Sequence, residues 1–145
     1  MPLLPLFIAV LAQSVPVPTV DLVCRGSGET IQMVKLTAAE KARTPDLNFR
    51  RQADPFRGAI RISVRPTGSE AELPAAMVGP YGDRTVELAK LKVSRELIEG
   101  KLSIALLYSP LFKINRVTGS ISVQGSQGNF SGECEPYDPS AKPKF

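Results

Sequence analysis

The stretch INRVTGSISVQGSQGNFSGEC, residues 114–134, decides the fold class of this 145-residue sequence. Small and apolar residues alternate with polar ones on both sides of a GSQG turn signal at 125–128. The positions expected to face inward are Val117, Gly119, Ile121 and Val123 before the turn, and Phe130, Gly132 and Cys134 after it. The pattern predicts a hairpin of two half-buried strands near the end of the chain.

The same period of two recurs at intervals along the rest of the sequence. It appears in four further segments, VDLVCRGSG at 20–28, GAIRISVR at 58–65, RTVELAKLKV at 84–93 and IEGKLSIALLY at 98–108. In the third of these the alternation slips near Ala89 and Lys90, which indicates a β-bulge. Six to eight short strands separated by turn signals predict an all-β protein, a small antiparallel β-barrel or sandwich.

At most one short helix is expected. Thr37 is followed three residues later by Glu40, the spacing of a capping box, so a short helix can begin there and end before Pro45. The sequence leaves open whether residues 37–57 form helix, loop or strand.

The N-terminal residues predict export. An apolar run too short to span a bilayer, followed by a proline-rich stretch, is typical of a secretory signal peptide over residues 1–12. The alternative is a first strand, which Pro2 and Pro5 would interrupt. We therefore expect a leader at 13–19, one β-domain at 20–138, a tail at 139–145, no transmembrane span, and a periplasmic or secreted location.

Cys24 and Cys134 are the two cysteines of the chain. In an oxidising compartment two thiols in a small domain normally form a disulfide, which here would join the first strand to the last. In the chain-entropy model, a disulfide that closes the long loop from Cys24 to Cys134 stabilises the fold by roughly 4 to 5 kcal/mol. The alternative, a reactive cysteine, has no CxxC motif to support it.

Several kinds of catalysis and metal binding find no support. Histidine is absent, which removes the usual general base and the commonest metal ligand. Disulfide-bonded cysteines cannot ligate zinc, so we expect neither metal nor cofactor. Glu133 and Glu135 lie about 7 Å apart on one strand face, a spacing that suits a glycosidase pair, although adjacent acids on a solvated face are far commoner. We therefore expect a protein that is not an enzyme.

A basic segment runs from Lys35 to Arg65, with eight basic residues and three acidic ones. Five arginines of this segment are candidates for a patch that binds an envelope lipid or another polyanion: Arg50, Arg51, Arg57, Arg61 and Arg65. The alternative is a solvated face that keeps the protein soluble. The formal net charge of +4 falls short of the basic clustering of nucleic-acid binders, so no nucleic-acid partner is expected.

A small β-barrel can also hold a ligand in its interior. The candidate lining of such a cavity is Leu102, Ile104, Leu106, Ile121 and Phe130. With few aromatic residues, the core can instead fill itself.

CRGSG at 24–28, NRVTGSISVQG at 115–125 and GNFSGECEPYDPSAKPKF at 128–145 together resemble a group of small exported hypothetical proteins of sphingomonad-type alphaproteobacteria. The resemblance implies an envelope location and assigns no functional residues. The sequence thus predicts a binding protein for a small apolar ligand or an anionic envelope component, and the alternative is a module that caps or inhibits a protein partner.

Overall fold

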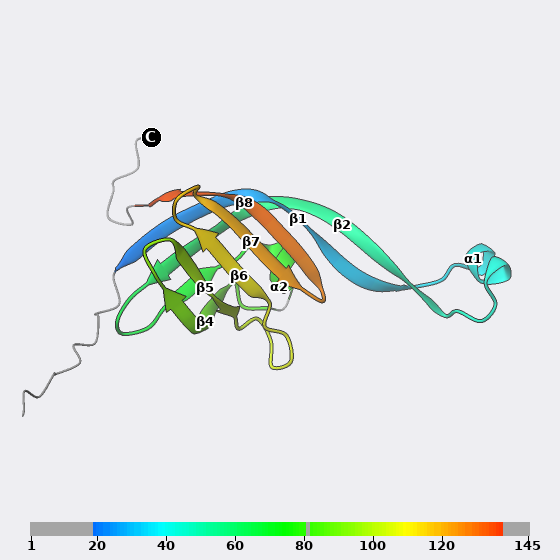
Figure 1. Ribbon diagram of the computed structural model, residues 1–145. Helices are drawn as coiled ribbons and strands as arrows, with labels where there is room; N and C mark the ends of the chain where they lie inside the picture. The colour runs from blue at the N-terminus through cyan, green and yellow to red at the C-terminus, as the bar shows by residue number, and fades with distance from the viewer. Residues whose placement is uncertain (1–18, 81, 138–145) are drawn as a thin grey trace, which may run out of the picture.

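The computed structural model describes residues 19–80 and 82–137, which form a closed antiparallel barrel with strand order β1 to β8 (Figure 1). The strands are β1 (Val20–Lys35), β2 (Phe49–Val64), β3 (Glu70–Glu72), β4 (Thr85–Val93), β5 (Leu97–Leu102), β6 (Leu111–Asn115), β7 (Ser120–Gly125) and β8 (Gly128–Pro136). Two short helices, α1 (Ala38–Arg43) and α2 (Ala75–Val78), interrupt them. The all-β barrel is confirmed, with a second single-turn helix that the sequence pattern did not predict. The expected signal peptide, residues 1–12, lies outside the described residues.

The barrel core follows the alternation of the strands. The inward residues of β2, Ile60, Ile62 and Val64, are fully or almost fully buried. So are Ile121 and Val123 of β7 and Phe130 of β8. The predicted terminal hairpin is confirmed, because β7 pairs with β8 from Ser120 opposite Glu133 to Gly125 opposite Gly128. The interior is a packed layer of aliphatic side chains and two phenylalanines.

Closure of the barrel depends on a close approach of β1 to β8. These strands pair from Leu22 opposite Pro136 to Thr30 opposite Gly128. Gly26 lies opposite Gly132, and a Cβ atom on Gly26 would stand 2.0 Å from the carbonyl oxygen of Ser131. Glycine is therefore required here because the two backbones leave no room for a side chain.

The predicted bulge in β4 is confirmed. Pairing with β5 shifts register between Ala89 and Lys92, and Lys90 has a φ of 51°. The extra residue explains why Leu88 and Leu91, on opposite parities in the sequence, both pack against the core.

The prediction of one strand over residues 98–108 is wrong beyond Leu102. β5 ends there, and residues 103–110 form a loop whose tip is a tight turn between Ala105 and Tyr108. The Leu102 N–H donates to the carbonyl of Pro110, so the chain turns back and pairs Leu111 of β6 with Lys101. Alternation in the sequence could not reveal that the barrel needs only a short strand at this place.

Val117 also departs from prediction, since it is 77% exposed rather than facing inward. The Asn115 side-chain oxygen accepts hydrogen bonds from the backbone N–H groups of Val117 and Thr118. Gly119 then takes a φ of 79°. An asparagine-capped turn therefore begins where the strand was expected.

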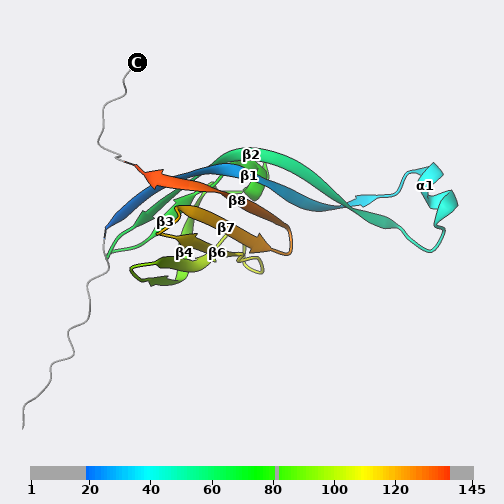
Figure 2. The ribbon, with the colours of Figure 1, turned by 45° about the horizontal axis from the view of Figure 1, so that its top comes forward.

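The most unusual feature of the fold is a two-stranded arm, residues 31–53, that continues β1 and β2 beyond the barrel (Figures 1 and 2). β1 pairs with β8 only as far as Thr30, whereas β1 and β2 remain paired out to Lys35 and Phe49. α1 lies at the tip. The short helix predicted after Thr37 is confirmed, and Thr37 is its N-cap, because the Glu40 N–H donates to the Thr37 hydroxyl.

Candidate functional site

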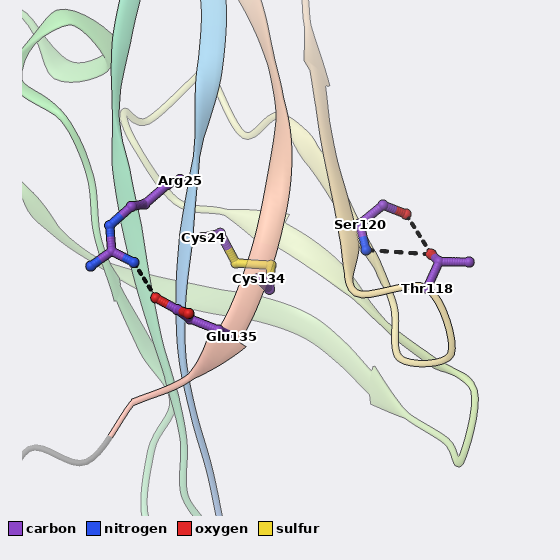
Figure 3. The surroundings of a disulfide bond; sticks show 6 residues. All are labelled: Cys24, Arg25, Thr118, Ser120, Cys134 and Glu135. Atoms are coloured by element: carbon purple, nitrogen blue, oxygen red, sulfur yellow. Dashed lines mark hydrogen bonds and ion pairs between the residues drawn. A yellow bond between two sulfur atoms is a disulfide. The ribbon is translucent and has the colours of Figure 1, made fainter.

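Cys24 and Cys134 form the expected disulfide between β1 and β8 (Figure 3). Cys24 is fully buried, and the pair sits directly opposite one another in the β1–β8 register. On the outer face beside it, Arg25 pairs with Glu135, and both side chains are largely exposed. An exposed ion pair of this kind contributes little to stability. The cysteines thus act as a structural crosslink.

Glu133 and Glu135 lie on the outer face of β8, exposed to solvent. Glu135 is engaged with Arg25, and Glu133 stands opposite Arg25 and Ser120 in the register. Within the described residues no group of three His, Cys, Asp or Glu side chains is placed to hold a metal ion. These two acids therefore have the setting of a solvated strand face.

The candidate cavity residues do not enclose a ligand site. Leu102, Ile121 and Phe130 belong to the packed core, and Ile104 packs against it partly buried. The prediction is wrong for Leu106, which is 97% exposed at the tip of the loop between β5 and β6. Near Ile104 a cavity of about 20 Å³ remains, which is enough for one water molecule.

The five candidate arginines do not form one patch. Arg65 directly follows β2, and the fifteen residues from Arg50 to Arg65 span roughly 50 Å at 3.3 Å per residue. Near the barrel end of β2, the Nη2 atom of Arg65 donates to both carboxylate oxygens of Asp21, at 2.7 and 2.9 Å. Arg61 stacks over the Tyr137 ring, 4.9 Å from its centroid. Both belong to the end of the barrel away from the arm.

Near the arm the other three arginines differ in their contacts. The Nε atom of Arg50 lies 2.9 Å from a carboxylate oxygen of Glu40, which ties α1 to β2. Among the described residues Arg51 and Arg57 make no ion pair. Arg57 lines an open hollow at the root of the arm together with Ser27 and Ser131. Of the five arginines, Arg51 on the arm and Arg57 at its root are therefore the ones available to a partner.

The arm carries the whole charge imbalance of the described residues. Its 23 residues include five basic side chains, Lys35, Lys41, Arg43, Arg50 and Arg51, and two acidic ones, Glu40 and Asp46. The remaining described residues contain eleven basic and eleven acidic side chains. A net charge of +3 is thus concentrated on a projection while the barrel itself is neutral.

One face of the arm combines this charge with exposed apolar groups. In the register Ile31 lies opposite Ala53, Met33 opposite Arg51, and Lys35 opposite Phe49. Because alternate pairs of an antiparallel ribbon share a face, these six residues form one surface, which we call the Met33 face. Met33 is 64% exposed and Phe49 is 53% exposed. No acidic residue belongs to this set.

Sequence reasoning found the basic residues of the arm but not Met33 and Phe49. Their only signal was an apolar residue beside each basic cluster, at Met33 before Lys35 and at Phe49 before Arg50. The sequence does not reveal the pairing of β1 with β2, and this pairing is what places Met33 and Phe49 on one face.

Comparison of the chain with protein-family models, with curated proteins and with solved structures finds no match. Neither of the two helices in the described part of the chain is long and apolar enough to cross a membrane.

Proposed function

We propose that the protein is a non-enzymatic, exported binding module that docks on an anionic lipid surface of the cell envelope through its arm. The observation that carries the proposal is the concentration of all the excess positive charge of the described residues on a projecting ribbon, whose Met33 face also exposes apolar side chains.

The chemistry of a lipid surface matches both properties. Each Lys or Arg near an anionic membrane surface contributes about 1 kcal/mol of attraction. Apolar side chains next to such cations gain further free energy by entering the boundary between headgroups and acyl chains. Met33 and Phe49 lie directly across the ribbon from Arg51 and Lys35, so both contributions act at the same place.

The packed barrel favours a partner that docks on the outer surface and argues against a ligand held in the interior. The core residues fill the interior, and the adjoining cavity of about 20 Å³ cannot hold a small apolar molecule. The disulfide is compatible with export, because disulfides persist in oxidising compartments. The resemblance to small exported proteins points the same way.

The arm can be removed to test the proposal, because no core residue lies between positions 31 and 53. In the shortened variant Asn-Gly replaces residues 33–51 and joins Gln32 to Gln52, which are paired in the ribbon. Asn-Gly is the preferred two-residue hairpin turn.

We expect the disulfide-intact wild-type protein to sediment with phosphatidylglycerol vesicles and not with phosphatidylcholine vesicles. The shortened variant should unfold cooperatively near the wild-type temperature and sediment with neither. Failure of the wild-type protein to sediment with either kind of vesicle would overturn the proposal and favour the alternative, a protein partner. Equal binding by the shortened variant would show that the arm is not the docking element.

A further inference from the structure

The loop between β5 and β6 exposes two neighbouring leucines at its tip. Leu106 and Leu107 are each 97% exposed, the highest values among the large apolar side chains of the described residues. Gly, Asn, Asp and Ser are the usual residues of such tight turns, because glycine adopts positive φ and the short polar side chains hydrogen-bond to the turn backbone. Two fully exposed leucines here mark an interaction site rather than a requirement of the turn.

The turn is held in a fixed shape. The Ala105 N–H donates to the carbonyl of Tyr108, and the Tyr108 N–H donates back to the carbonyl of Ala105, both at 3.1 Å. On either side, Ile104 packs against the core, and the Tyr108 hydroxyl occupies the space that a Cβ atom on Gly125 would take. The leucines are therefore presented by a short, anchored hairpin, which loses little conformational freedom when its tip is bound.

This tip lies at the same end of the barrel as the arm. Ile104 and Tyr108 line the small cavity together with Thr30 and Phe56, which stand at the root of the arm. Figure 1 shows the loop below β6 on the side from which the arm projects. The large exposed apolar residues of this end are Met33, Leu47, Phe49, Leu106, Leu107 and Leu111, whereas Val117 and Tyr137 belong to the opposite end.

The surroundings of the tip repeat the chemistry of the Met33 face. Leu111 is half exposed and stands opposite Lys101 on the outer face of the barrel. A cation therefore lies behind the leucine tip, as Arg51 and Lys35 lie beside Met33 and Phe49. This combination is complementary to an anionic interface with an apolar layer beneath it.

We propose that the Leu106–Leu107 tip inserts into the acyl layer of the anionic membrane on which the arm docks. The inference rests on the proposed function of the arm. A convex apolar tip fits a bilayer without any matching shape, whereas a protein partner would need a pocket made for it. Since the loop and the arm lie at the same end of the barrel, binding of the arm brings the tip near the surface at high effective concentration.

The chain contains no tryptophan, so a single introduced tryptophan reports its own surroundings. Leu107→Trp places the reporter at the tip. Val117→Trp is the matched control, because Val117 is also an exposed turn residue but lies at the opposite end of the barrel. With phosphatidylglycerol vesicles we expect a blue shift at position 107, and quenching by lipids brominated on the acyl chain, with neither effect at position 117.

The second measurement is the affinity of Leu106→Ser/Leu107→Ser for the same vesicles. Both side chains lie outside the core, so the variant should keep the wild-type unfolding temperature. Burial of a leucine corresponds to about tenfold in affinity, so we expect a loss of roughly a hundredfold for the pair.

The outcomes separate the two proposals. Vesicle binding that depends on the arm, with the tryptophan at 107 remaining in water and the serine variant binding as well as wild type, would overturn the inserted tip and leave the docking arm intact. Failure of the wild-type protein to bind any anionic vesicle would overturn both. A blue shift at 107 and 117 alike would show unspecific adsorption and would also overturn the tip proposal.

Discussion

Removal of the disulfide should lower the free energy of unfolding by about 5 kcal/mol. The bond joins residues 110 positions apart, and in the chain-entropy model a crosslink around a loop of that length restricts the unfolded chain by this amount at 25 °C. The change to make is Cys24→Ala/Cys134→Ala. The barrel should still close, because β1 and β8 pair over nine residue pairs from Leu22 to Thr30.

The assay is unfolding in guanidinium chloride, followed by circular dichroism, with extrapolation to water. Cys24 is fully buried, so the alanine variant also loses packing contacts of the sulfur atom. Wild-type protein held reduced is the control that separates the crosslink from this loss of volume. The reduced protein should also show a steeper dependence on denaturant, because its unfolded chain exposes more surface.

A decrease of less than about 1 kcal/mol in both the variant and the reduced protein would refute this reasoning. It would mean that the unfolded chain keeps β1 and β8 close without the bond, so that the crosslink restricts nothing.

Three further predictions concern the barrel. Phe130→Ala should lower the free energy of unfolding by about 3 to 5 kcal/mol, because the ring is fully buried and stacks 6.1 Å from that of Phe56. Leu106→Ala should change it by less than about 0.5 kcal/mol. Equal losses for the two variants in chemical denaturation would contradict the placement of Leu106. Gly26→Ala should prevent normal closure and lower the melting temperature sharply, since the new Cβ meets backbone of β8, and wild-type melting would contradict that close contact. Burial raises the pKa of Tyr108, a hydrogen bond from the Gln127 backbone opposing it in part, so the folded state keeps a proton that the unfolded chain loses above pH 10. Stability should therefore fall as pH rises beyond 10, and a Tyr108→Phe variant that falls as steeply would contradict this assignment.

The sequence was sufficient for the terminal hairpin, the disulfide and the bulge. The hairpin and the bulge rest on local signals: the alternation around Ile121 and Phe130, the turn at 125–128, and the slip of parity at Ala89 and Lys90. The pairing of Cys24 with Cys134 followed because a chain with two cysteines has one possible disulfide.

The arm could not be predicted because its two strands are separated by the thirteen residues 36–48, which include a helix instead of a short turn signal. A two-stranded ribbon is marginally stable alone, and here it forms because β1 and β2 are already paired in the barrel. The prediction of a single basic patch is wrong for a related reason. Arg50 and Arg65 are close in the sequence, but an extended strand carries them to opposite ends of the molecule.

The loop at 103–110 shows the limit of alternation as a signal. Ile104 and Leu106 continue the parity of Leu102, yet only Ile104 packs against the core. Pairing with β6 ends β5 at Leu102, and that pairing is set by the barrel rather than by the local sequence.

The docking of the arm on anionic lipid is tested most directly by two variants of equal charge. Lys35→Gln/Arg51→Gln neutralises the Met33 face, and Lys92→Gln/Arg95→Gln removes the same charge from exposed positions on the barrel. At about 1 kcal/mol per cation, the arm variant should bind phosphatidylglycerol vesicles roughly 30-fold more weakly than wild type, with the barrel variant within about threefold. Equal affinities for the two variants would contradict the account, because binding would then follow the total charge of the protein and not the arm.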